Sequence, residues 1–271
     1  MAKFNEITPV QLMRLIGTPD APVVVDVCID ADFQDDPRVV PTAMRIPHLT
    51  IGDHAKTLQG KHVVVICQKG KKLSHGAAAI LRANEIRAEV LTGGNFAWRD
   101  AGLPLVPTAH IPNFQNSPSR WVTRHRPKVD RIACPWLIRR FIHPQAQFMF
   151  VPPADVSEVA EKFDATPFDI DGIFWSHDGE NCTFDTMIKH FCLTTPALSA
   201  LSDVVRAADT NTHHLSPQAA GLLAISVGLS HQYSDDTAQL EAGMVVYDAM
   251  YRWARDGQAE GHDWPDSGQK P

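Results

Sequence analysis

Two runs of β-branched residues constrain the fold of this chain more than any other feature. Residues 23–27 read Val-Val-Val-Asp-Val, and residues 63–66 read Val-Val-Val-Ile. Apolar runs of this length are typical of strands that are buried on both faces of a parallel sheet. Helices are expected over 9–16 and 74–84, and a further strand over 88–91. This order predicts an α/β domain in which helices flank a parallel sheet.

Four prolines mark the point at which this pattern ends: Pro104, Pro107, Pro112 and Pro118. Each proline fixes φ and removes a backbone donor, so we predict that this stretch is extended, exposed and poor in contacts. The predicted division is a first domain over 1–107, a linker over 108–118, a second domain over 119–257 and a flexible tail over 258–271.

The second domain is predicted to contain fewer strands and more helices than the first. Strands are expected over 121–123, 147–151 and 173–175, and helices over 130–141 and 154–163. Pro135 should lie in or near the first turn of the helix over 130–141, or else the helix is shorter at its start. Later, residues 235–255 place Leu240, Met244, Tyr247 and Tyr251 on one apolar helix face. The domain is therefore predicted to be α+β and mostly helical.

Charge and cysteine content argue against several classes of protein. The formal net charge of −6 disfavours bulk affinity for nucleic acid or an anionic membrane. No apolar run reaches the roughly 18 to 20 residues that a spanning helix needs, and no signal peptide is visible. The five cysteines form no C-x-x-C pair. We therefore expect reduced thiols, no disulfide framework and a cytoplasmic protein.

Cys67 stands where the second β-branched run gives way to a helix. The loop after it reads Gln68-Lys69-Gly70-Lys71-Lys72. A sulfur placed before a helix N-terminus faces unpaired N–H groups and the helix dipole, which favour a thiolate or a persulfide. Gly70 lets the backbone curl around the sulfur, and the lysines would attract an anionic donor such as thiosulfate. We predict that Cys67 is a nucleophile and that residues 68–72 form its anion-binding loop; the alternative is a structural cysteine beside solvated lysines.

The segment Cys67-Gln68-x-Gly70-x-Lys72 resembles the active-site loop of rhodanese-like sulfurtransferases. Residues 91–104 are similar to the closing motif of that domain, and residues 25–27 to its opening segment. The resemblance implies that sulfur moves from a small anionic donor to Cys67, and then to a thiol or cyanide-like acceptor, without a cofactor. Cys28 stands where family members often carry Arg, so it is a candidate second thiol. A phosphatase is not expected, because Leu73 occupies the position of the essential loop Arg.

Seven cations and a single acid lie between residues 120 and 140. Two interpretations remain open for this basic run. It is either a solvated helix face with ion pairs, or a pocket for an oxyanion with Arg124, Lys128 and Arg131 as candidate ligands. Duplex nucleic acid is not an expected partner, because large apolar residues interrupt the run as a buried core would.

Residues of metal-binding type gather farther along the chain. The candidates for a metal ion are His177, Cys182, Asp185 and Asp209. Their spacing matches no metal motif, so a structural role for each of them stays open.

Residues 121–141 closely resemble the C-terminal domain of the ChrB chromate-resistance family, as do the segments 177–185, 207–210, 218–226 and 247–249. The resemblance covers about residues 119–256 and implies a link to chromate handling or sensing. Chromate-sensing members carry a different N-terminal domain, proposed to bind DNA, and here a rhodanese-like domain replaces it. We therefore predict a sulfurtransferase linked to chromate or oxyanion resistance. The alternative is a non-enzymatic, chromate- or metal-responsive sensor.

Overall fold

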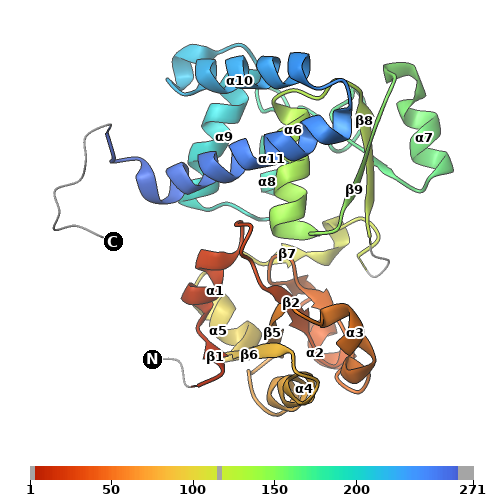
Figure 1. Cartoon of the computed structure of the whole chain (residues 1–271), viewed down its shortest axis with the longest axis vertical. Helices are drawn as coiled ribbons and strands as arrows, with labels where there is room; N and C mark the ends of the chain where they lie inside the picture. Colours follow the sequence, from red (N-terminus) through yellow and green to blue (C-terminus); the bar gives the residue numbers. More distant parts are fainter. Residues whose placement is uncertain (1–3, 115–117, 262–271) are drawn as a thin grey trace.

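The computed structural model describes residues 4–114 and 118–261, which form two packed domains (Figure 1). The first domain contains a five-stranded parallel sheet in the order β1-β6-β5-β2-β4. Its strands are β1 (Glu6–Ile7), β2 (Val23–Asp26), β4 (Met44–Arg45), β5 (His62–Ile66) and β6 (Arg87–Leu91). Its helices are α1 (Pro9–Leu15), α2 (Asp30–Asp35), α3 (Ala55–Leu58), α4 (Lys72–Ala83) and α5 (Gly94–Asp100). The predicted α/β fold is confirmed.

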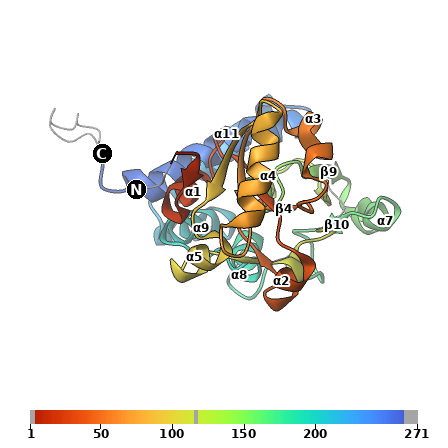
Figure 2. The same cartoon turned by 90° about the horizontal axis from the view of Figure 1, so that it is seen from below.

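The β-branched runs form the centre of this sheet because both of its faces are covered. Val63 and Val65 belong to a core with α3 and α4, and Figure 2 shows α4 on the side turned away from the second domain. Val64 and Ile66 point to the opposite face and join a core that includes α1, α5 and the second domain. The alternation of side chains along a strand thus divides one apolar run between two cores.

The second domain combines a small parallel sheet with a group of helices. The sheet has the order β10-β8-β9, formed by β8 (Arg120–Arg124), β9 (Gln147–Val151) and β10 (Thr166–Pro167). The helices are α6 (Asp130–Leu137), α7 (Val156–Lys162), α8 (Thr183–His190), α9 (Pro196–Asp209), α10 (Ala219–Gln232) and α11 (Asp236–Arg252). A π-helix, η3 (Ile138–Ile142), continues α6. The prediction of a mostly helical α+β domain is confirmed.

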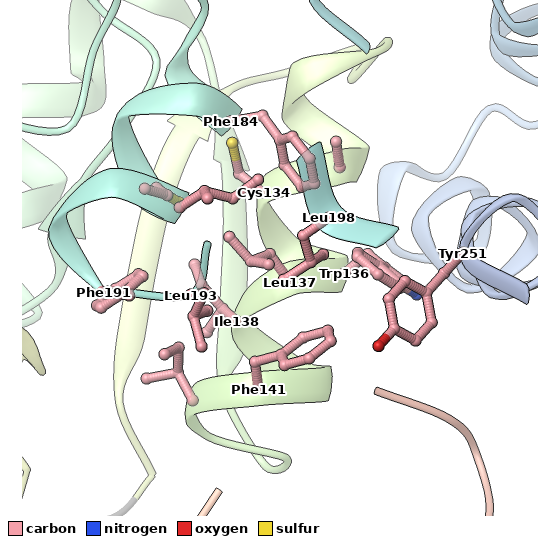
Figure 3. Packing of buried hydrophobic residues seen from close by; sticks show 14 of the residues in the cluster. Cys134, Trp136, Leu137, Ile138, Phe141, Phe184, Phe191, Leu193, Leu198 and Tyr251 are labelled. Carbon is pink, nitrogen blue, oxygen red and sulfur yellow. The ribbon is translucent and has the colours of Figure 1, made fainter. Parts of the chain in front are cut away.

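The core of the second domain gathers around α6, where Trp136, Phe141 and Tyr251 meet with ring centroids 5.5 to 5.8 Å apart (Figure 3). Every residue of α6 except Arg131 is buried. Among the described residues, no helix has both the length and the apolar character needed to cross a membrane.

Two local expectations for this domain are wrong. Pro135 lies in the interior of α6 rather than near its start, because contacts from other helices fix the start at Asp130. Ser226 accepts a hydrogen bond from the Val129 N–H, and the Tyr247 hydroxyl donates to the Val129 carbonyl. Residues 173–175 form bends instead of a strand, since the Trp175 ring packs on Phe191 and its carbonyl accepts from Asp169.

The stretch between the domains is well packed, contrary to the expectation of an exposed linker with few contacts. Val106 is buried in β7 (Val106–Pro107), which pairs in antiparallel fashion with β3 (Arg38–Val39). Ile111 is also buried, and the Phe114 ring stacks on Phe33. Residues 115–117 and residues 262–271 of the expected tail lie outside the described part of the chain. The prolines therefore shape a connector whose described residues are fixed by both domains.

Direct contacts join the two domains beyond the connector. The Thr42 N–H donates to the Phe141 carbonyl at 2.8 Å, and the Arg255 guanidinium donates to the Arg14 carbonyl at 2.8 Å. At Gly17, φ is +81°, and a Cβ atom there would lie 2.4 Å from the Phe141 ring. The apolar core that contains these aromatic residues is continuous from one domain to the other.

Candidate functional sites

The first site lies at the carboxyl end of β5, where the chain turns from the sheet into α4. Cys67 ends the buried run and is itself 4% exposed. Its Sγ lies 3.2 Å from the hydroxyl of Ser74, in the first turn of α4. Ser74 Oγ donates to the Lys71 carbonyl in this arrangement, so the Cys67 thiol can donate to the hydroxyl oxygen. If the thiol ionises, the same hydroxyl can turn and donate to the sulfur.

Two glycines hold the cysteine loop against the start of α5. Gly70 and Gly94 have φ values of +59° and +61°. A Cβ at Gly94 would lie 2.0 Å from the Cys67 carbonyl oxygen, so a side chain at this position requires the loop to move. The N–H groups of Asn95 and Phe96 donate to the carbonyls of Cys67 and Gln68, each at 3.1 Å. The loop and the segment over 91–104 therefore form one structural unit.

The lysines predicted for the loop lie on its outer surface. Lys69, Lys71 and Lys72 are exposed, and the Lys69 ammonium lies 6.0 Å from the centroid of the Phe96 ring. The three exposed cations make the surface of this loop positive, which favours the approach of a small anion.

Cys28 lies beside the same loop but in a different electrostatic environment. Asn95 Nδ2 donates to Cys28 Sγ at 3.5 Å and to Asp26 Oδ2 at 3.3 Å. Burial raises the pKa of the Cys28 thiol strongly, and the neighbouring Asp26 carboxylate raises it further. Cys28 is therefore held as a neutral thiol. Ser74 and Asn95 were not predicted as site residues, although both lie within segments that were singled out for other reasons.

The second site gathers polar side chains from three elements of the C-terminal domain. Asp130 is the first residue of α6, Asp209 is the last residue of α9, and His177 lies in the loop before α8. His177 Nε2 is 3.2 Å from Asp209 Oδ2 and 3.7 Å from Asp130 Oδ2. Val129, just before Asp130, has a φ of +42°, an unusual conformation for a β-branched residue. The contacts of Ser226 and Tyr247 with Val129 keep Asp130 in this position.

Asp169 links this cluster to the basic run. Its Oδ2 lies 3.0 Å from Arg124 Nη2 and 3.3 Å from Arg131 Nε. Its Oδ1 accepts from the Thr183 hydroxyl at 3.0 Å and lies 3.6 Å from His177 Nε2. Two of the three predicted oxyanion ligands therefore meet at a buried carboxylate, which already neutralises part of their charge. Lys128 is half-buried and takes no part in these ion pairs.

Burial and neighbouring charges shift the pKa values of the residues in this cluster. Burial raises the pKa of Asp130, and the nearby Asp209 and Asp169 carboxylates raise it further. Burial also raises the pKa of Asp209. The hydrogen bond to Asp169 raises the pKa of His177 to about 9, helped by the Asp130 and Asp209 charges. Burial tends to raise the pKa of Asp169, but hydrogen bonds from His177 and Arg124 lower it more, so that the pKa lies below its usual value.

Of the four candidate metal ligands, the structure brings His177 and Asp209 together and leaves the other two outside the group. Cys182 is fully buried at the start of α8, and burial followed by the Asp130 charge raises its pKa. Asp185 accepts from the Cys182 N–H at 3.0 Å and from Arg206 at 2.8 Å. The sequence did not identify Asp130 and Asp169, which complete the cluster.

Comparisons with known proteins match the two domains separately. Residues 8–101 match the family model of the rhodanese-like domain, and residues 121–254 match that of the ChrB C-terminal domain. The first part of the chain is therefore similar to rhodanese-like domains, and the second part to the ChrB C-terminal domain. Protein ChrB of Cupriavidus metallidurans is 28% identical over 209 residues, which cover 72% of this chain. The match spans 63% of the length of that protein.

Solved structures match the first domain. A rhodanese-like domain protein from Staphylococcus aureus is 28% identical, and the match covers 35% of this chain and 91% of that one, with a TM-score of 0.31. A thiosulfate sulfurtransferase from Pseudomonas aeruginosa is 25% identical, and the match covers 38% of this chain and 19% of that one, with a TM-score of 0.32.

Proposed function

We propose that this protein is a rhodanese-type sulfurtransferase that carries sulfane sulfur as a persulfide on Cys67 and serves chromate or oxyanion resistance. The observation that carries the proposal is the position of the Cys67 sulfur, buried between the end of β5 and the first turn of α4. The carboxyl ends of parallel strands are where α/β sheets bind ligands. The link to chromate comes from the likeness of the second domain to ChrB.

The reaction proceeds in two displacement steps at this sulfur. In the first, the Cys67 thiolate attacks the outer sulfur of thiosulfate, the S–S bond of the donor breaks, and sulfite leaves with the electron pair. In the second, a nucleophile such as cyanide attacks the outer sulfur of the persulfide, thiocyanate leaves, and the Cys67 thiolate is regenerated. No electron enters or leaves over the two steps, and no metal or organic cofactor is needed.

Different residues around Cys67 stabilise the anionic sulfur, attract the donor and hold the loop backbone. The Ser74 hydroxyl is placed to donate to the anionic sulfur, and Lys69, Lys71 and Lys72 attract the negatively charged donor. Gly94 and Gly70 fix the loop backbone by close contact. Cys28 stays protonated beside Asp26, so the proposal assigns it no nucleophilic role.

Replacement of the nucleophile tests this proposal with Cys28 as a matched control. Purified protein treated with thiosulfate should gain one sulfur atom by intact-mass analysis, and thiocyanate should form when cyanide is added. Cys67→Ser should remove both signals while the fold survives, because a serine hydroxyl has far too high a pKa to act as this nucleophile. Cys28→Ser should retain most of the turnover. Turnover by Cys67→Ser, or a sulfur adduct at another cysteine, would overturn the proposal.

The second candidate function is a non-enzymatic sensor of chromate or of a metal ion. The cluster of Asp130, His177 and Asp209 favours it, because side chains of these types can bind a metal ion. The two functions separate in the same assay. A sensor should show no turnover of thiosulfate even when Cys67 is intact, whereas the sulfurtransferase should turn over without added chromate or metal.

A further inference from the structure

In the second domain, one nitrogen of His177 lies 3.2 to 3.7 Å from three carboxyl groups that come from different elements. We propose that Asp130, His177 and Asp209 hold a divalent first-row transition metal ion. One ligand atom from each of these residues lies within 4.8 Å of the other two. The inference concerns the second domain alone and does not depend on sulfur transfer at Cys67.

The distances from His177 to the two carboxyl groups are close to those between ligands of one ion. Oxygen and nitrogen ligands lie about 2.0 to 2.2 Å from a metal such as Zn²⁺, so neighbouring ligand atoms are separated by about 3.0 to 3.6 Å. His177 Nε2 lies 3.2 Å from Asp209 Oδ2 and 3.7 Å from Asp130 Oδ2. The side chains therefore need only small adjustments to coordinate one ion.

Asp130 supplies an independent sign of a missing partner. Its side chain is 1% exposed, and its Oδ2 accepts a hydrogen bond from the Thr183 N–H at 2.7 Å. Its Oδ1 is buried and meets no hydrogen-bond geometry with the described residues, while the Cys182 thiol acts on the same carboxyl group and the contact with His177 is made by Oδ2. A buried carboxylate oxygen without a partner carries a large desolvation cost. A cation at the cluster would satisfy this carboxylate.

Asp169 acts as a positioning residue rather than a ligand. Both of its oxygens are already engaged, one by the Thr183 hydroxyl and the other by Arg124 and Arg131. Thr183 contacts Asp130 and Asp169 together, so it fixes the two carboxyl groups relative to each other. Partners of this kind, which orient ligands from behind, are typical of metal sites in proteins.

The donor set indicates the class of metal. One imidazole with two carboxylates suits Mn²⁺, Fe²⁺ or Zn²⁺, whereas Mg²⁺ and Ca²⁺ prefer oxygen ligands alone, and Cu⁺ prefers sulfur. The site is open to solvent on one side, because the His177 side chain is 42% exposed. Three protein ligands leave room for water or another small ligand on that side.

Mn²⁺ is the probe of choice, because it binds oxygen and nitrogen ligands in preference to the five cysteines of the chain. Full-length protein is stripped with a chelator and titrated with Mn²⁺ by calorimetry and by electron paramagnetic resonance of the free ion. About one Mn²⁺ should bind per chain. His177→Gln and Asp209→Asn should each weaken binding by at least about tenfold.

Matched controls separate the site from general charge effects. His190→Gln removes another histidine of the same domain, and Asp185→Asn neutralises a half-buried carboxylate outside the cluster. Both controls should bind Mn²⁺ like the wild type. If wild-type protein binds no Mn²⁺, or if His177→Gln and Asp209→Asn bind it as well as the controls do, the cluster is an ion-pair network and the proposal is overturned.

Discussion

The two candidate sites differ in how the chain assembles them. The Cys67 site is built from a strand end, the loop that directly follows it and one glycine pair that supports the loop. The Asp130 cluster collects side chains from the start of α6, the end of α9 and the intervening loop at His177. A site made by a continuous segment can be predicted from that segment. A site made by tertiary packing becomes visible only when the elements are placed in space.

The sites also differ in where their charge lies. Around Cys67, three lysines are exposed and the cysteine itself is buried. In the second domain Asp130 and Asp169 are buried and Asp209 is half-buried, and the counter-charges come from His177, Arg124 and Arg131. The first arrangement favours the anionic donor that we propose for Cys67, whereas the second would have to exchange part of its ion pairing for the proposed metal ion. If the two sites are independent, a change at one should leave the other intact.

Gly94→Ala should cause the largest loss of stability and of sulfur transfer, and it should affect the first site alone. The new Cβ would lie 2.0 Å from the Cys67 carbonyl oxygen and 2.4 Å from the Gly70 nitrogen, so the loop must shift. We expect a free energy of unfolding lower by about 3 kcal/mol and a loss of most sulfur transfer, measured by urea unfolding and thiocyanate formation. Mn²⁺ affinity should not change.

Gly102→Ala is the control for this change. Gly102 has a φ of +67°, close to that of Gly94, but no atom lies within 4 Å of its would-be Cβ. Backbone strain alone should cost about 1 kcal/mol, with sulfur transfer retained. Equal effects of the two substitutions would show that close packing against Cys67 does not matter, and a loss of Mn²⁺ binding in Gly94→Ala would show that the sites are coupled.

Most of the first domain and its site could be predicted, because their determinants are local. The strand expected over 88–91 appears as Arg87–Leu91, and the helix expected over 74–84 appears as Lys72–Ala83. Burial of both sheet faces leaves a clear apolar run in the sequence. The contact between Cys67 and Ser74 follows from the same segment, although Ser74 was identified only as part of a helix.

The second site could be predicted only in part, because no local pattern encodes it. His177 and Asp209 were candidates by residue type, whereas Asp130 looked like an ordinary acid within a basic run. Its role depends on Val129, whose conformation is held by Ser226 and Tyr247 from distant helices. The packed connector was missed for a similar reason. Prolines indicate an extended backbone, but they do not say which surfaces that backbone covers.

Gly17→Ala should have an intermediate effect and should act on both regions at once. Its Cβ would lie 2.4 Å from Phe141 and 2.8 Å from Tyr251, two buried rings of the second domain. We expect a free energy of unfolding lower by about 1 to 3 kcal/mol. Tryptophan fluorescence during urea unfolding should report a loss of stability in both domains, since Trp98 and Trp136 belong to the same core.

Gly60→Ala is the matched control for the interface. Gly60 has a φ of +73°, but no atom lies within 4 Å of its would-be Cβ. It should therefore lose less stability than Gly17→Ala. If the two variants have the same free energy of unfolding, the contact at Gly17 does not stabilise the domains against each other. Each site would then belong to an independent folding unit.

The smallest expected effect concerns pH and His143, which lies where the two domains meet. Its Nδ1 faces the N–H of Ser119 at 3.2 Å and the Ser119 hydroxyl at 2.9 Å, and burial lowers its pKa below the usual 6.5. The neutral ring is therefore favoured in the folded state. Its contribution to stability is fully present above the unfolded pKa, near 6.5, and is lost as the pH falls through the lower folded value. Between pH 7.5 and 5.5, wild-type protein should lose more stability to urea than His143→Gln, whose amide oxygen can still accept from Ser119.

His231→Gln, on the exposed side of α10, is the control and should follow the wild type. An unchanged pH dependence in His143→Gln would show that protonation at the domain boundary does not contribute, and that any acid sensitivity arises elsewhere, for example in the carboxylates of the second site.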